Sequence, residues 1–419
     1  MTASTAASRA RAVVAGRTTR LDGLRTWLPA LRYCAAVYAV VRVALILLGA
    51  AAWGLTSEQA SVGPDGKVAG LTNGWHNAFT GWNKQDSLWF LEIARHGYSA
   101  TNASAAFFPG YPALIRLVGY LTAGNLLVAA YLVANAALLA ALVIFYRLTE
   151  REYDLATARR AVLYLAIFPT AFFLFDTYSE ALFLLFAVGA ISLARRGQWW
   201  WAGLAGLGAT LTRSTGVVLA VALAVEAVQQ TVTDRRLGSE GGSTRRWVIS
   251  GLATRLAASA LPLAGVGGYL LFWQLRYHDW YRPLRLENSV WGRVFSAPWH
   301  TFWQGMIMAF RYAPNGNEGW WMLDFLLVAA GLALGVWVAA RARPVYAVYT
   351  WGAILYFLSA AWPGRPLASD PRYLVVLFPL VWPLARLGRR PGWHDAVVAV
   401  SAASMAIVGW LFLATTLVF

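Results

Sequence analysis

Apolar runs long enough to cross a membrane recur along the whole chain, separated by short polar segments. These runs cover residues 31 to 52, 124 to 147, 158 to 175, 179 to 194, 250 to 273, 321 to 340, 345 to 362, 372 to 387 and 394 to 418. The stretch 199 to 229 is long enough for two shorter spans that break near Arg213. The pattern predicts an all-α polytopic membrane protein with about 11 transmembrane helices.

Composition supports a membrane protein. Of the 419 residues, 59% are hydrophobic and 13% are charged, whereas about 25% of residues are charged in soluble proteins. The formal charge of +16 could suggest a nucleic-acid partner. The basic residues instead cluster beside the ends of apolar runs, where they act as topology signals. We therefore expect membrane lipids around the chain and no nucleic acid.

The arginine clusters predict which side of the membrane each loop occupies. All of them can be cytoplasmic if the N-terminus is inside and the spans alternate. The segments 53 to 123, 276 to 320 and 363 to 371 then lie outside, together with Asp176, Tyr178, Arg213 and the C-terminus. This topology requires that residues 107 to 122 lie at the interface or re-enter without crossing.

The remaining pattern indicates one transmembrane domain over residues 27 to 419. Residues 1 to 26 form a basic cytoplasmic tail that we expect to be disordered, and residues 230 to 247 read as a flexible cytoplasmic connector. The external segments 53 to 123 and 276 to 320 are rich in Trp and Tyr, which predicts amphipathic helices along the outer interface. Abundant Ala and scarce Lys indicate a GC-rich bacterial genome, and hence a bacterial plasma membrane.

Asp86 stands out because it falls within an apolar helical pattern. Trp82, Trp89, Phe90 and Ile93 recur around it at helical spacing and predict a shared face. A carboxylate on such a face is costly unless it is paired or used in catalysis. Aromatic rings desolvate a neighbouring carboxylate and offer a surface for a sugar. Asp86 is therefore a candidate general base for an acceptor hydroxyl, with a capping or pairing role as the alternative.

Glu180, Arg213 and Arg372 fall on the same predicted side of the membrane. Each alone fits a simpler role, because a carboxylate favours the helix N-terminus and arginines snorkel at membrane interfaces. Together they suit a phosphate-bearing lipid, since Arg binds phosphate through paired N–H donors. His96 and Glu92 are spaced for a pair on a helix surface, with a substrate-binding role for His96 as the alternative.

Several kinds of chemistry have no motif in the chain. The five histidines lack HxxxH or HExxH spacing and no Asp-x-Asp pair is present, so we expect no metal. Cys34 is the single cysteine and excludes an intramolecular disulfide. The absence of GxGxxG, Walker and GxSxG patterns argues against nucleotide use and serine hydrolysis. No cofactor is expected.

The string WNKQDSLWFLEIARHGY, followed by AAFFPGYP, resembles the first external loop of the PIG-V-type mannosyltransferases. Weaker matches follow in order, namely FPTAFFLFDTYSEALFLL, LTRSTGVVLA and PRYLVVLFPL, so that the resemblance spans about residues 80 to 380. Gly110 stands where relatives often have Leu. The resemblance implies a GT-C-type membrane glycosyltransferase with a polyprenyl-phosphate sugar donor, commonly mannose. It also implies an essential acidic residue in the first external loop, which is Asp86 here.

We accordingly expect sugar transfer, with inversion, to an extracytoplasmic lipid, glycan or protein acceptor. Arg213 and Arg372 are predicted to neutralise the departing phosphate. The other predicted substrate-binding residues are Trp82, Trp89 and Tyr98, which would line the sugar pocket, and Glu180, His96 and Tyr178.

Two other functions fit the same apolar pattern, namely a transporter or flippase of lipid-linked sugars and a non-catalytic partner of an envelope enzyme. Transporters place ionisable groups near the membrane midplane and show inverted repeats. Here the polar groups fall at the external ends of the spans and no repeat is visible, which favours the transferase.

Overall fold

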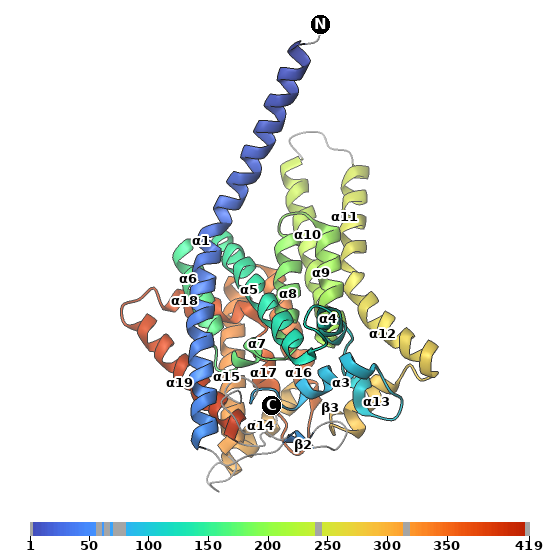
Figure 1. The fold of residues 1–419 in the computed structure, drawn as a ribbon, viewed down its shortest axis with the longest axis vertical. Coiled ribbons are helices and arrows are strands. Elements are labelled where there is room, and N and C mark those ends of the chain that lie inside the picture. Colours follow the sequence, from blue (N-terminus) through green and yellow to red (C-terminus); the bar gives the residue numbers. More distant parts are fainter. Residues whose placement is uncertain are drawn as a thin grey trace.

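The computed structural model describes residues 3–55, 61–62, 68–69, 81–238, 245–312 and 319–414, and this part of the chain is almost entirely helical (Figure 1). The helices up to the middle of the chain are α1 (Ala3–Leu55), α3 (Asp86–His96), α4 (Gly110–Gly119), α5 (Leu126–Glu152), α6 (Leu155–Ala166), α7 (Phe172–Phe175), α8 (Glu180–Ala194), α9 (Trp199–Thr212) and α10 (Val218–Gly238). The later helices are α11 (Arg245–Ser259), α12 (Leu261–Tyr277), α13 (Arg282–Ser289), α14 (Pro298–Tyr312), α15 (Gly319–Arg341), α16 (Pro344–Leu358), α17 (Asp370–Leu374), α18 (Val381–Leu387) and α19 (Trp393–Ala414).

Short elements connect these helices. The 3₁₀ turns are η1 (Ala103–Ala106), η2 (Ser214–Val217) and η4 (Phe378–Leu380). The strands form two short antiparallel pairs, β1 (Ser61–Val62) with β2 (Val68–Ala69), and β3 (Val294–Phe295) with β4 (Ala360–Ala361). The second pair joins the segment after α13 to the segment after α16.

The predicted all-α membrane fold is confirmed. Within the described residues, six helices are long and apolar enough to cross a membrane, and Glu180–Ala194 and Pro344–Leu358 are shorter apolar helices. The six are Trp27–Ala52, Leu126–Glu152, Ser214–Arg236, Gly251–Tyr277, Trp320–Arg341 and Trp393–Ala414. The chain is therefore a multi-pass membrane protein, although this part of it does not yield the expected count of about 11 spans.

Two of the predicted runs are divided into pieces too short to cross. The run 158 to 175 becomes α6 and α7, and the run 372 to 387 becomes α17, η4 and α18. Pro169 and Pro379 lie at these divisions, and proline lacks an N–H and disfavours helical geometry in the residue before it. The predicted break near Arg213 is present, since α9 ends at Thr212 and Arg213 has extended backbone angles.

Residues 107 to 122 do not form a spanning helix. Their helix, α4, has 10 residues, which corresponds to a length of about 15 Å. A hydrocarbon core about 30 Å thick cannot be crossed at that length. This agrees with the expectation from the arginine pattern that the segment does not cross.

The N-terminal segment differs from the sequence prediction. Residues 3–26, expected to be disordered, are the first half of α1 and extend away from the bundle (Figure 1). Ala and Arg are strong helix formers, and a helix already nucleated in an adjoining span extends at low cost. The predicted connector 230 to 247 is also more helical than expected, because α10 continues to Gly238 and α11 begins at Arg245. Residues 239–244 lie outside the described part of the chain.

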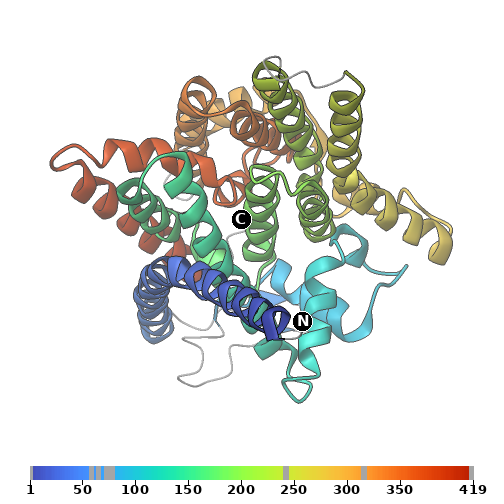
Figure 2. The ribbon, with the colours of Figure 1, turned by 90° about the horizontal axis from the view of Figure 1, so that it is seen from above.

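Helix α8 lies near the middle of the bundle (Figure 2), and its two ends have different chemistry. Glu180 opens it, and Arg195 follows its last residue. Arg195 binds Glu152 at 2.8 Å and Glu226 at 2.9 Å. Arg389 pairs with Asp154, which lies two residues after Glu152. Arginines from separate clusters thus meet acidic partners at the end of α8 opposite Glu180, while the side of the membrane that this end faces stays a prediction.

The predicted topology can be tested by cysteine labelling in a Cys34→Ala background. An impermeant reagent should modify Ser61→Cys and Asn288→Cys in intact cells, because both positions are predicted to be outside. Ser239→Cys should react only after permeabilisation. Labelling of position 239 in intact cells would invert the model and place Asp86 on the cytoplasmic face.

Candidate active site

Asp86 is the first residue of α3, which corrects its predicted place inside an apolar stripe. Trp82 precedes the helix and therefore cannot share a helical face with Asp86, whereas Phe90 and Ile93 follow it and are buried. The free N–H groups and the dipole of a first helical turn favour a carboxylate. The Asp86 side chain is also 27% exposed, so it is accessible to a substrate.

The loop before Asp86 is tied down on several sides. The Nζ of the buried Lys84 donates to the Leu413 carbonyl at the end of α19, at 2.7 Å. The Lys84 carbonyl accepts from the hydroxyls of Tyr178 and Ser87, each at 2.7 Å. Gln85 has a φ of 53°, which is unfavourable for a residue other than glycine. These contacts maintain the strained residue that directs Asp86 into the site.

Glu180 joins two arginines in the core of the protein. It opens α8 and its side chain is fully buried. Its Oε1 accepts from the Nε of Arg372 and, at 2.6 Å, from the Nη1 of Arg213. A buried carboxylate is tolerated when it is paired and hydrogen-bonded, and here two guanidinium groups share that task.

Arg372, on α17, connects Glu180 to Asp86. Its Nη1 lies 2.6 Å from the Asp86 Oδ2, and its side chain is 2% exposed. The guanidinium lies over the rings of Tyr178 and Phe173, with the carbon Cζ at 4.7 and 5.0 Å from their centroids. Arg372 is therefore enclosed by two carboxylates and aromatic rings, and the predicted direct contact with a lipid phosphate does not follow from its position.

Arg213 occupies the break between α9 and η2. Its Nη1 also donates to the Ser179 hydroxyl at 3.2 Å, and its guanidinium lies 4.9 Å from the centroid of the Tyr373 ring. The side chain is 14% exposed, so Arg213 is more accessible than Arg372. A helix that continued through Arg213 would give this residue helical backbone angles in place of the extended angles seen here.

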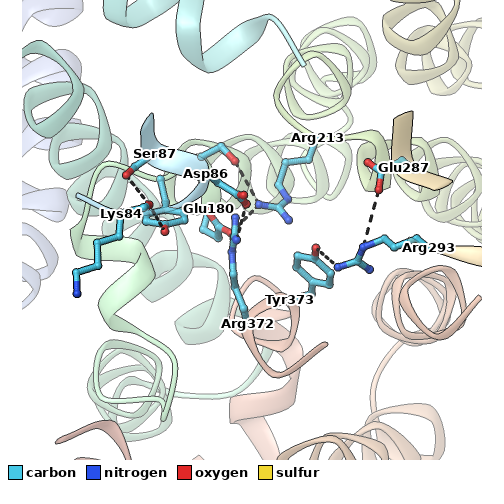
Figure 3. Close-up of polar contacts among 11 residues, drawn as sticks. Lys84, Asp86, Ser87, Glu180, Arg213, Glu287, Arg293, Arg372 and Tyr373 are labelled. Atoms are coloured by element: carbon cyan, nitrogen blue, oxygen red, sulfur yellow. Dashed lines mark hydrogen bonds and ion pairs between the residues drawn. The ribbon is translucent and has the colours of Figure 1, made fainter. Parts of the chain in front are cut away.

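Asp86, Arg372, Glu180 and Arg213 thus form one ion-pair network, shown in Figure 3. The four residues come from α3, α17, the start of α8 and the break that follows α9. The structure brings together four predicted site residues that are far apart in the sequence, while their roles stay predictions. Removing one member of a buried network leaves a charge without its partner, which costs more than the pair contributes.

Two predicted sugar-binding aromatics lie elsewhere. Trp82 is 4% exposed and packs against Phe172 and Phe412, so it belongs to the core. The hydroxyl of Tyr98 donates to the Phe107 carbonyl at 2.7 Å, and its ring packs in an aromatic cluster with Tyr269. Trp82 is thus an interior ring, which corrects its predicted place in a sugar pocket, whereas Tyr98 is half-buried and its predicted role stays a prediction.

Other predicted residues have clear positions relative to the network. Trp89, three residues after Asp86, stacks on Phe107 and lies 6.5 Å from the centroid of Trp291. The ring of Tyr178 packs against the guanidinium of Arg372. His96 is exposed and its Nδ1 contacts Glu92 at 2.9 Å, which corresponds to the surface pair and leaves His96 outside the network.

Three residues next to the network were missed from the sequence, namely Glu287, Arg293 and Tyr373. The Nη2 of Arg293 donates to the Tyr373 hydroxyl at 3.3 Å, and its Nε lies 3.8 Å from the Glu287 Oε2 (Figure 3). Tyr373 follows the predicted Arg372 directly. For Glu287 and Arg293 the only signal was their place in the external segment 276 to 320, because their approach to the site depends on the β3–β4 pairing.

In the described part of the chain, no group of three or more His, Cys, Asp or Glu residues could hold a metal ion.

The fold and the network describe a multi-pass, all-α membrane protein with a charged site at one end of its helices. The family model described as Mannosyltransferase (PIG-V) matches residues 38–237, and this confirms the family resemblance indicated by the motifs. The match and the helical membrane fold support a membrane glycosyltransferase. The matched range includes Asp86, Glu180 and Arg213 and ends before Arg372.

Comparison with solved structures gave weaker likenesses. The oligosaccharyltransferase of Archaeoglobus fulgidus, in a complex with Zn and sulfate, is 13% identical, with 90% of this chain and 53% of that chain covered and a TM-score of 0.44. ArnT from Cupriavidus metallidurans, bound to undecaprenyl phosphate, is 13% identical, with 90% and 75% covered and a TM-score of 0.47. The chain spans about half the length of that oligosaccharyltransferase. A search of curated proteins gave no match.

Proposed function

We propose that the protein transfers a sugar, by family mannose, from a polyprenyl-phosphate donor to an acceptor hydroxyl on the extracytoplasmic side, with inversion. The acceptor oxygen attacks the anomeric carbon while the bond from that carbon to the phosphate oxygen breaks. The electron pair of that bond leaves with the polyprenyl phosphate. The acceptor proton passes to Asp86.

The observation that carries this proposal is the asymmetry of the Asp86 carboxylate. Its Oδ2 is held by Arg372, and its Oδ1 has no hydrogen-bond partner among the described residues. The side chain is partly exposed, so the free oxygen is available to a substrate hydroxyl. A positioned carboxylate with one engaged and one available oxygen suits general base catalysis.

The arginines supply the charge compensation that a metal supplies in many phosphate enzymes. Preorganised cationic donors stabilise charge that develops during a reaction, at no cost for rearrangement. Arg372 orients Asp86 and Glu180 from within the network, while the more accessible Arg213 can face the leaving phosphate. On this account transfer needs no cofactor and no metal ion.

The proposal is tested with membranes that contain the protein, a radiolabelled polyprenyl-phosphate mannose and an acceptor extract. We expect a labelled acceptor product that does not form from GDP-mannose and that persists in EDTA. Membranes without the protein are the control. Absence of product from the lipid-linked donor, with the protein folded and present, would contradict the proposal.

A further inference from the structure

Three guanidinium groups surround the ring of Tyr373. Their Cζ atoms lie 4.9 Å from its centroid for Arg213 and 5.8 Å for both Arg293 and Arg372. Like charges gathered in a partly buried place require counter-charges. How the nearby carboxylates are shared among the three arginines therefore indicates which of them can still receive an anion.

The counter-charges are shared unequally. Arg372 is paired with both Asp86 and Glu180. Arg213 has only a share of the same Glu180 oxygen, and its Nε and Nη2 have no hydrogen-bond partner in the described ranges. For Arg293 the carboxylate oxygen of Glu287 is 3.8 Å away, which is too far for a good hydrogen bond.

The other contacts of Arg293 are with neutral groups, and they hold it in place. Its Nη1 donates to the Ala360 carbonyl at 3.2 Å and its Nη2 to the Tyr373 hydroxyl at 3.3 Å. Its backbone N–H donates to the Glu287 carbonyl at 2.9 Å, after Gly292 with a φ of +64°. The guanidinium is thus positioned in advance, and its charge is only weakly balanced.

We propose that Arg213 and Arg293, next to the Tyr373 ring, bind the phosphate of an isoprenoid lipid phosphate, and that Glu287 pairs with Arg293 when this lipid is absent. The identification of the lipid rests on the proposed function. Arg binds phosphate oxygens through directed N–H pairs, and two arginines can contact different oxygens of one phosphate. Figure 3 shows the side chains of Arg213 and Arg293 ending near Tyr373.

Apolar side chains near Arg293 favour a lipid phosphate over a free phosphate ion. Phe295, two residues after Arg293, is 88% exposed, and Trp299 is 76% exposed at the start of α14. Trp is enriched at membrane–water interfaces, at the depth of lipid headgroups. A phosphate that reaches Arg293 with an isoprenoid tail would have apolar surface to contact.

Glu287 can leave Arg293 easily. Its side chain is 47% exposed, and its carboxylate oxygen lies 3.8 Å from the Arg293 Nε, beyond good hydrogen-bond distance. Asp86 and Asp370 are also close enough for their negative charges to act on Arg293. Asp86 is paired with Arg372, and burial raises the pKa of Asp370 to about 7, so this carboxylate is only partly ionised near neutral pH. Glu287 is therefore the carboxylate whose removal should favour the lipid.

The test is a binding titration of farnesyl phosphate on the purified full chain in nanodiscs of zwitterionic lipid. We expect Arg293→Ala to weaken binding by about 10-fold or more, with Arg293→Lys in between. Glu287→Gln should strengthen binding by about 2-fold to 5-fold. Arg285→Ala is the matched control on α13, because Arg285 is exposed and pairs with Asp279, and it should bind like the wild type. A thermal unfolding curve for each variant shows that it is folded.

The opposite signs for Arg293 and Glu287 separate a binding site from a structural ion pair. Equal weakening by Arg293→Ala and Glu287→Gln, or wild-type binding by folded Arg293→Ala, would overturn the proposal. Farnesol binding as tightly as farnesyl phosphate would show an apolar site only, and inorganic phosphate binding equally well would show a general anion site. Either result also overturns it. Transfer assays on the same samples keep the proposals apart, because the wild type could bind farnesyl phosphate as expected and yet transfer no sugar.

Discussion

Asp86→Asn should lower the rate of sugar transfer by about 10²-fold to 10⁴-fold, the usual effect of removing a general base. The amide keeps the shape of the side chain and can still accept from Arg372, so binding of the donor and the fold should change little. The measurement is kcat with a polyprenyl-phosphate sugar, using purified protein and saturating donor.

A second carboxylate provides the control for this variant. Asp279→Asn changes an aspartate of the predicted external segment that is 27% exposed, like Asp86, and that pairs with Arg285 outside the network. It should transfer sugar at the wild-type rate. Wild-type turnover by folded Asp86→Asn would end the assignment of Asp86 as the base.

Arg372→Ala should cost on the order of 2 to 4 kcal/mol in transition-state stabilisation, because Asp86 and Glu180 lose the cation that orients them. The variant should also unfold at a lower temperature, since it leaves Glu180 buried with only Arg213 as partner. Arg372→Lys keeps the charge but cannot donate to both carboxylates from one planar group. We expect it to be intermediate in kcat/KM.

A positioning role predicts more than a loss of stability. Arg372 holds the base and does not face the donor, so Arg372→Ala should lower kcat while the KM for the donor changes little. Arg365→Ala is the matched control, because Arg365 is also buried and pairs with Asp324 at 2.5 Å outside the network. It should lose stability without lowering kcat. Retention of wild-type kcat/KM by both Arg372 variants would show that this arginine has no part in transfer.

Much of the helical framework follows from local patterns in the sequence. The apolar runs predict the long spans, and the arginines at their ends predict that residues 107 to 122 cannot cross. The polar LTRSTG segment marks the break that presents Arg213. Such features depend on neighbouring residues only, so one sequence is sufficient to find them.

The site itself depends on contacts between distant segments. Helical spacing placed Asp86 inside a stripe, because periodicity does not show that the chain turns sharply at Gln85. The same spacing could not separate Trp82, which packs in the core, from Trp89 beside the site. Arg293 comes within reach of Tyr373 through a pairing between β3 and β4, and no local pattern records such a pairing.

The most direct test of the account counts products in proteoliposomes that contain purified protein, a polyprenyl-phosphate sugar and an acceptor. The wild type should release one polyprenyl phosphate for each sugar that appears on the acceptor, and Asp86→Asn should release almost none. A transporter or flippase would instead move the intact donor across the bilayer without releasing polyprenyl phosphate. Movement of intact donor by the wild type, or equal release by Asp86→Asn, would contradict the assignment of this network to sugar transfer.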